Sequence, residues 1–272
     1  MCLFCDFVAK ISAAPKRIKD KKLAETLIDF GVHFKDCRGW TTLYHAIQRN
    51  LPEVVEKLLK NGANPSVRAN GRVALLFDKT IEAQTPFELA VNLNRVEILR
   101  LFLKQYEFKP VPLSFDILKC MLFSDNFEIA KILLDHGLID PNSSKQVALM
   151  SYAILHGKHQ WIKLLLEHGY EVDKVDKYGH TGLHLALMCG NNKIIQLFLE
   201  DEANPNQLMP GGYLYPLTVA LTKQNGAGTD LLIKFGASLK LRNISGNTVF
   251  EEILKSKSWN QMKQVIFLTQ NE

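Results

Sequence analysis

A unit of about 33 residues recurs along this 272-residue chain, and the recurrence limits the possible folds more than any other feature. The clearest copy runs from Asp176 to Asn206. It holds a turn, a short apolar helix after Thr181, a break at Gly190 and a second apolar run. The residues that close four successive copies stand 32, 33 and 34 positions apart: Gly137, Gly169, Glu202 and Gly236. A fixed period of this length predicts stacked structural repeats rather than one globular core.

The marks of this copy recur in register elsewhere in the chain. Residues 36–65 repeat the turn, both apolar runs and the closing Gly62-Ala63-Asn64-Pro65. Thr85 to Ala90 and Pro216 to Ala220 open two further copies. Because turn, helix and exit marks return together, the pattern predicts a chain of paired helices.

The motif Thr181-Gly182-Leu183-His184-Leu185-Ala186 resembles the T-P-L-H-x-A signature of the ankyrin repeat, with Gly182 in place of proline. The resemblance covers most of the chain. It implies an all-α ankyrin-repeat solenoid of about six to seven stacked helix-turn-helix repeats with short β-hairpin turns.

No linker rich in Gly, Ser or Pro divides the chain, so we expect a single ankyrin-repeat domain over residues 1–272. Repeats 110–142 and 143–175 lack the motif but keep helical apolar spacing, so both should stack. The expected divisions are an N-terminal capping repeat at 1–35, repeats at 36–67, 68–109, 110–142, 143–175, 176–207 and 208–241, and a C-terminal cap at 242–272.

Two stretches depart from the regular pattern. The connection from Ser66 to Gln84 is long and includes the apolar run 73–77, which predicts an extended β-hairpin finger that is either functional or a covering flap. Gly226 and Gly228 fall where a second helix should begin. Since glycine costs about 1 kcal/mol in a helix interior, we expect that helix to start late or fray.

Composition excludes several classes of protein. An apolar fraction of 47% with 22% charged residues is ordinary for a folded soluble protein, and a net charge of +5 is too mild for a dedicated nucleic-acid binder. Five irregularly spaced cysteines favour a reducing, cytoplasmic compartment, which would be the host cytosol or nucleus for a secreted effector. No apolar run approaches the roughly 18 residues that span a bilayer. We interpret the basic segment 16–22 as a solvated turn, although basic runs also suit nuclear import, anionic lipid or nucleic acid.

Catalytic and metal-binding patterns are weak. The chain has no HExxH, G-x-S-x-G or P-loop motif, and the C-x-x-C pair Cys2 and Cys5 has no second pair to complete a zinc site. The resemblance implies that His184 serves the turn by hydrogen bonding between repeats. His180 and Cys189 give only weak support for a thiol–imidazole pair. We therefore expect no enzymatic activity, no cofactor and no metal.

The resemblance implies that a protein partner binds the concave face, formed by finger tips and by first-helix positions that packing leaves free. Trp40 and Tyr178 are the expected anchors, because large aromatic residues are enriched at interface centres. The predicted function is a monomeric, non-catalytic scaffold, adaptor or effector of an intracellular bacterium. The alternatives are an enzyme using the groove or the 66–84 finger, and nucleic-acid or lipid binding by segment 16–22. The predicted protein-binding residues are Arg38, Trp40, Gln48, Arg49, Gln84, Lys145, His156, Lys177, Tyr178, His180, Met188 and Lys223, with Asn92, Leu93, Leu214 and Thr222 at further free positions.

Overall fold

The computed structural model describes two compact units, one ending at Leu138 and the other beginning at Ile139. Residues 1–26 lie outside the described part, and with them Cys2, Cys5 and the basic segment 16–22. The described residues are 27–29, 31–36, 39–68, 73–74, 80–81, 84–105, 113–124, 126–209, 214–255 and 266.

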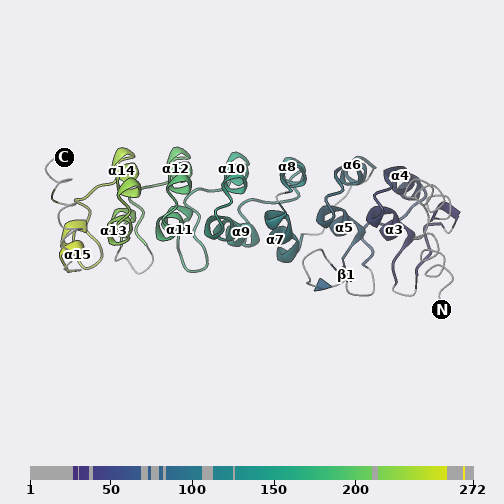
Figure 1. The fold of residues 1–272 in the computed structure, drawn as a ribbon, viewed down its shortest axis with the longest axis horizontal. Helices are drawn as coiled ribbons and strands as arrows, with labels where there is room; N and C mark the ends of the chain where they lie inside the picture. Colours follow the sequence, from purple (N-terminus) through teal and green to yellow (C-terminus); the bar gives the residue numbers. More distant parts are fainter. Residues whose placement is uncertain are drawn as a thin grey trace. The chain divides into compact units, whose positions relative to one another are not determined.

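Among the described residues of the first unit, three helix pairs lie in two layers (Figure 1). First helices pack on first helices and second helices on second helices, since α3 contacts α5 and α5 contacts α7, while α4 contacts α6 and α6 contacts α8. The pairs are α3 (Thr42–Gln48) with α4 (Pro52–Lys60), α5 (Pro86–Asn92) with α6 (Val96–Gln105), and α7 (Phe115–Phe123) with α8 (Phe127–Asp135).

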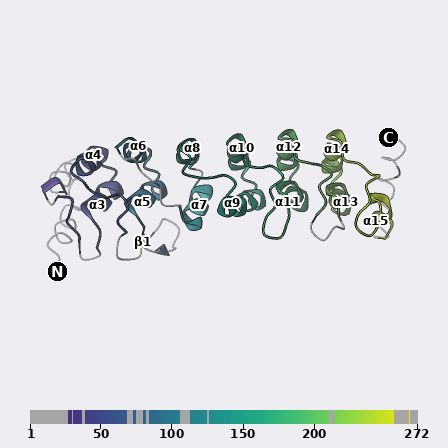
Figure 2. The same ribbon diagram turned by 180° about the vertical axis from the view of Figure 1, so that it is seen from behind.

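The second unit has the same two-layer arrangement, which Figure 2 shows from behind. Helix α11 packs between α9 and α13 in one layer, and α12 packs between α10 and α14 in the other. The pairs are α9 (Ser144–Leu155) with α10 (His159–Glu167), α11 (Gly182–Cys189) with α12 (Asn192–Glu200), and α13 (Pro216–Thr222) with α14 (Gly226–Lys234); α15 (Val249–Lys255) follows on α13.

These helix pairs confirm the predicted all-α fold class. The repeats at 110–142 and 143–175, which lack the motif, each form a complete pair that packs on a neighbour in its own unit. Apolar spacing was sufficient because burial of one helical face, not the turn motif, supplies most of the stability of a short helix. Among the described residues, no helix is long and apolar enough to cross a bilayer.

The residues that close the second helices adopt the left-handed backbone conformation. Gly137, Gly169 and Gly236 have φ angles of 65°, 83° and 90°. Glu202 takes the same conformation with φ of 65°, although it carries a Cβ atom. The closing geometry is therefore kept where the sequence loses its glycine, because the chain must turn out of the helix at this point.

Asparagine side chains join successive repeats in the second unit. The amide of Asn142 donates to the Gly169 carbonyl (2.8 Å) and accepts from the Glu171 N–H (2.7 Å). Asn206 does the same with the Gly236 carbonyl (3.0 Å) and the Ser238 N–H (2.9 Å). Each amide therefore satisfies two backbone groups at the end of the next second helix.

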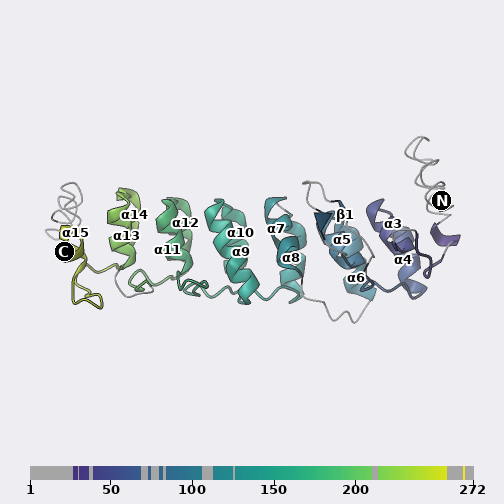
Figure 3. The same ribbon diagram turned by 90° about the horizontal axis from the view of Figure 1, so that it is seen from below.

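The long connection after the first described repeat forms a hairpin, as predicted. Strand β1 (Val73–Ala74) pairs antiparallel with β2 (Thr80–Ile81), with Val73 opposite Ile81. Figure 3 shows β1 beside the first-helix layer of its unit, near α5. The tip at 75–79 lies outside the described residues, so the choice between a functional finger and a flap stays a prediction.

The predicted late start of α14 is wrong, because this helix begins at Gly226. The side chain of the N-cap residue Asn225 accepts from the Gly228 N–H (3.0 Å) and donates to Asn192 of α12 (2.7 Å). A Cβ atom at Gly228 would lie 2.5 Å from the Asn225 amide nitrogen. Glycine is therefore required for the cap to pack over the first turn, and the cap offsets the cost of glycine in the helix.

Candidate protein-binding face

Two first helices of the second unit, α9 and α11, carry exposed apolar side chains at their carboxyl ends. Leu155 of α9 is 60% exposed and Met188 of α11 is 43% exposed. Each stands two residues before a left-handed glycine, Gly157 or Gly190, so they hold the same position in successive repeats. Tyr152, one turn earlier on α9, is also exposed. We call Tyr152, Leu155 and Met188 the apolar ridge.

The ridge is exposed because helix packing uses the other faces. In α11 the buried apolar residues are Leu183, Ala186 and Leu187, which follow the i, i+3, i+4 spacing of one helical face. Met188 lies next to that face and points away from the core. Packing therefore does not require an apolar residue there.

The charge around the ridge is one-sided. Helices α9, α11 and α13 contain no aspartate or glutamate. Lys145 at the start of α9, His156 at its end and Lys223 at the end of α13 are exposed. The first-helix layer thus combines apolar groups with basic ones, the chemistry that suits an acidic partner surface.

The loop before α11 presents Tyr178 on a well-ordered turn. One carboxylate oxygen of Asp176 accepts from the N–H groups of Tyr178 (2.8 Å) and His180 (2.9 Å). The Tyr178 ring is 65% exposed, with the Lys177 ammonium 4.8 Å from its centroid and the His180 ring 6.3 Å away. The turn therefore holds a large aromatic side chain in solvent beside a lysine.

The equivalent turn in the first unit buries its aromatic residue, so the expected exposure of Trp40 is wrong. The Asp36 carboxylate accepts from the Trp40 N–H (2.8 Å), which gives Trp40 the place that His180 has in the second unit. Its indole ring is 8% exposed and packs on Tyr44 and His45, with centroids 6.1 Å and 5.6 Å away. At the last position of the turn a large ring folds back onto α3. Arg38, which holds the place of Tyr178, lies outside the described residues.

Gln84 is also misplaced by the sequence prediction. It is 1% exposed, and neither of its amide atoms has a hydrogen-bond partner among the residues that the structure describes. It directly precedes the N-cap Thr85, where the chain enters the buried first turn of α5. A residue at that point is enclosed by the helix it introduces, so it is not a free surface position.

The remaining predicted residues divide between the two units. Gln48 and Arg49 are exposed at the end of α3, and Asn92 and Leu93 are half-buried at the end of α5. Leu214 is half-buried and Thr222 is exposed. The second unit collects most of the predicted set on α9, α11, α13 and the loop before α11: Lys145, His156, Lys177, Tyr178, His180, Met188 and Lys223.

Sequence reasoning missed Leu155 and Tyr152. The signal was available for Leu155, because it stands 33 residues before Met188. Counting back one period from a predicted surface residue would have found it.

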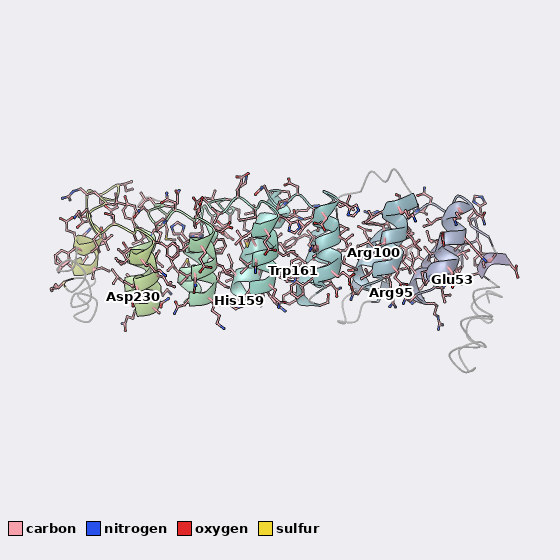
Figure 4. The ribbon with its side chains drawn as sticks, turned by 90° about the horizontal axis from the view of Figure 1, so that it is seen from above. Glu53, Arg95, Arg100, His159, Trp161 and Asp230 are labelled. Carbon is pink, nitrogen blue, oxygen red and sulfur yellow. The ribbon has the colours of Figure 1, made fainter. Side chains whose placement is uncertain are left out.

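The second helices offer a different surface, which Figure 4 shows from above. Acidic and basic groups are mixed there and pair with each other, as Arg100 does with Glu128 (3.2 Å) and Lys163 with Glu167 (3.7 Å). Such exposed pairs are typical of a solvated face. The view labels Glu53 on α4, Arg95 just before α6, Arg100 on α6, His159 and Trp161 on α10, and Asp230 on α14.

His184 has a structural environment. Its ring is fully buried, with Nδ1 3.2 Å from the Thr181 nitrogen and Nε2 2.9 Å from the Gln207 carbonyl oxygen. Burial lowers its pKa to about 4, although the bond to Gln207 acts in the opposite direction. A neutral ring that accepts at Nδ1 and donates at Nε2 fits both contacts. It links α11 to the following turn, the role that the resemblance implied.

The described residues show no catalytic or metal-binding cluster. No group of three His, Cys, Asp or Glu side chains among them could hold a metal ion. His180 precedes α11 and Cys189 ends it, which separates them by roughly 12 Å along the helix and rules out a thiol–imidazole pair. Cys120 and Cys189 are not joined in a disulfide.

Comparison with known proteins identifies the repeats. A family model for ankyrin repeats matches residues 12–112 and 117–209. An ankyrin repeat protein of Rickettsia felis is 24% identical, with 73% of this chain and 66% of that protein covered. One from Acanthamoeba polyphaga mimivirus is 20% identical, with 80% and 28% covered. The human transient receptor potential cation channel subfamily A member 1 is 26% identical, with 63% and 16% covered. The chain thus spans about two thirds of the rickettsial protein and much less of the other two. It belongs to the ankyrin-repeat family.

Proposed function

We propose that this chain is a non-catalytic scaffold that binds a protein partner through the first-helix face of its second unit. Ankyrin repeats generally mediate protein–protein interaction. The observation that carries the proposal is the exposure of Leu155 and Met188 on helices without aspartate or glutamate, and of Tyr178 beside Lys177 in the loop before α11. Large exposed apolar groups on a rigid frame are typical of binding anchors.

Tyr178 replaces Trp40 as the main anchor of the proposal. Leaving a tyrosine ring in water forgoes about 1.5–3 kcal/mol of apolar burial, which a partner can recover. The Asp176 turn fixes the backbone that carries the ring, so little backbone entropy is lost when a partner covers it. The scaffold would act in the cytoplasm, in a host cell if the protein is an effector.

The test compares two double variants by quantitative binding to partners captured from cell lysate. Tyr178→Ala with Met188→Ala should weaken binding by at least about tenfold and leave the melting temperature nearly unchanged. The matched control is Lys163→Ala with Lys193→Ala, which removes exposed lysines from the second helices α10 and α12. Equal binding by both double variants would move the site away from the first-helix face.

A further inference from the structure

The spacing of the apolar ridge limits the shape of what can cover it. Leu155 and Met188 hold equivalent positions on α9 and α11, which pack side by side. Packed helices lie about 8–10 Å apart. In a helix that crosses both, side chains seven residues apart are about 10.5 Å apart and lie on one face. In a strand, side chains on one face recur at about 6.6 Å or 13 Å and match the ridge less well.

The charges beyond the ridge indicate the polarity of the occupant. Lys223 ends α13, next to the position that Met188 holds in α11, and it forms no ion pair among the described residues. The acidic groups of the loop before α11 are already engaged: Glu171 pairs with Lys174 (3.0 Å), and Asp173 accepts from the Asn204 N–H (3.1 Å). A carboxylate from a partner is therefore the counter-ion that this end of the face lacks.

We propose that the first-helix face of the second unit binds an acidic amphipathic helix of a partner protein. This inference rests on the proposed function and specifies its partner. The helix crosses the carboxyl ends of α9, α11 and α13. Two of its apolar side chains, seven residues apart, cover Leu155 and Met188. A glutamate or aspartate on the same face, towards α13, pairs with Lys223. Docking of an apolar helical face onto exposed apolar residues is an established form of peptide recognition.

Fluorescence anisotropy with three synthetic helical peptides tests this proposal on the full chain. The first peptide carries two leucines seven residues apart and glutamates on the face towards α13. The second places the same leucines five residues apart, and the third replaces the glutamates by lysines. We expect the first peptide to bind at least about tenfold more tightly than either control. Equal binding of all three, or binding of none, would overturn the proposal.

Variants of the protein locate the contact. Leu155→Ser and Met188→Ser should each weaken binding of the first peptide by about tenfold without changing the melting temperature, because both side chains are exposed. Lys223→Glu should reverse the preference, so that the lysine peptide binds better than the glutamate peptide. Lys193→Glu on the second helix α12 is the matched control and should change neither affinity. If the Lys223 and Lys193 variants behave alike, the proposed charge contact is absent.

Two outcomes separate this inference from the proposed function. If partner capture still depends on Tyr178 and Met188 but no peptide binds, the helical occupant is wrong and the scaffold function stands. If capture depends on neither residue, both proposals fail. Sedimentation of wild type and Leu155→Ser checks for self-association. A dimer lost in the variant would show that a second copy covers the ridge, which also overturns the helical partner.

Discussion

The carboxyl ends of α3 and α5 differ from those of α9 and α11, although they occupy the same place in their repeats. Asn50, Asn94, Gly157 and Gly190 all adopt the left-handed conformation two residues later. At the position so defined, α3 and α5 have Gln48 and Asn92, whereas α9 and α11 have Leu155 and Met188. In addition, the Arg95 side chain donates a hydrogen bond to the Gln48 carbonyl at the end of α3 (3.3 Å).

This difference shows that the fold leaves the position free. Both kinds of residue allow the same helix end, so neither polar nor apolar chemistry is required by packing. Leu155 and Met188 are therefore not required by helix packing, which supports their place in the proposed binding face. The second helices show no such difference, because exposed acidic and basic side chains pair with each other in both units.

The largest expected effect is on stability, and it distinguishes the exposed position of Met188 from the buried position of Leu187. Leu187 is fully buried, and Leu187→Ala should lower the free energy of unfolding by about 2–5 kcal/mol, because it leaves a cavity between α11 and its neighbours. Met188→Ala should stay within about 0.5 kcal/mol of wild type. Urea denaturation measures both. Ile47→Ala and Gln48→Ala form the same pair in α3, and a large loss from Gln48→Ala would contradict the equivalence of the two ends.

Acid should lower the stability of the turn at α11, where His184 fills the histidine position of the T-P-L-H motif, more than that of the turn at α3. His184 has a folded pKa of about 4, below its ordinary value near 6.5, so the unfolded chain binds the proton more tightly. The contribution of the neutral ring is complete above pH 6.5 and is lost as the pH falls towards 4, by about 3 kcal/mol. Tyr44 holds this position in the repeat of α3, which therefore has no imidazole there. The free energy of unfolding, measured with urea from pH 7 to 4, should fall less steeply in His184→Gln than in wild type. An equal slope would contradict the role given to His184.

Gly182 occupies the position that Pro86 holds in the first unit, and the Phe198 ring leaves little room for a side chain there. A Cβ atom at Gly182 would lie 2.2 Å from the Phe198 ring. Gly182→Ala should therefore cost about 1–3 kcal/mol through overpacking, measured by thermal unfolding. Adding Phe198→Leu should make the alanine less costly than it is in the wild-type background. If the two effects simply add, the ring does not determine the choice of glycine.

The smallest expected effect concerns the bonds between repeats. Asp173 stands where Asn206 stands in the next repeat, but its carboxylate can only accept, from the Asn204 N–H. Asp173→Asn would supply an N–H donor at this position, as Asn206 does when it donates to the Gly236 carbonyl. The change should raise the free energy of unfolding by about 1 kcal/mol. Asn206→Asp is the reverse change and should lower it similarly. Thermal unfolding of both variants checks the sign, and shifts in the same direction would exclude the proposed exchange.

Periodicity identified the repeats, their helix pairs and most of the exposed face. The closing residues were found by counting, including Glu202, which keeps the left-handed conformation without glycine. Comparison of equivalent positions in successive repeats also predicted that Met188 and Lys223 lie on the surface, as they do. These properties could be predicted because helix formation, turn geometry and amphipathic spacing depend on residues close together in the chain.

Only the tertiary structure decided which side chains of that pattern are exposed. Trp40 holds the place of His180 in a turn built on the same aspartate hydrogen bond, and its ring packs onto α3, whereas Tyr178, two residues before His180, lies in solvent. The start of α14 at Gly226 likewise depends on Asn225 bonding to Asn192 of another helix. Burial and capping of this kind depend on atoms far apart in the sequence, so no local pattern contains them.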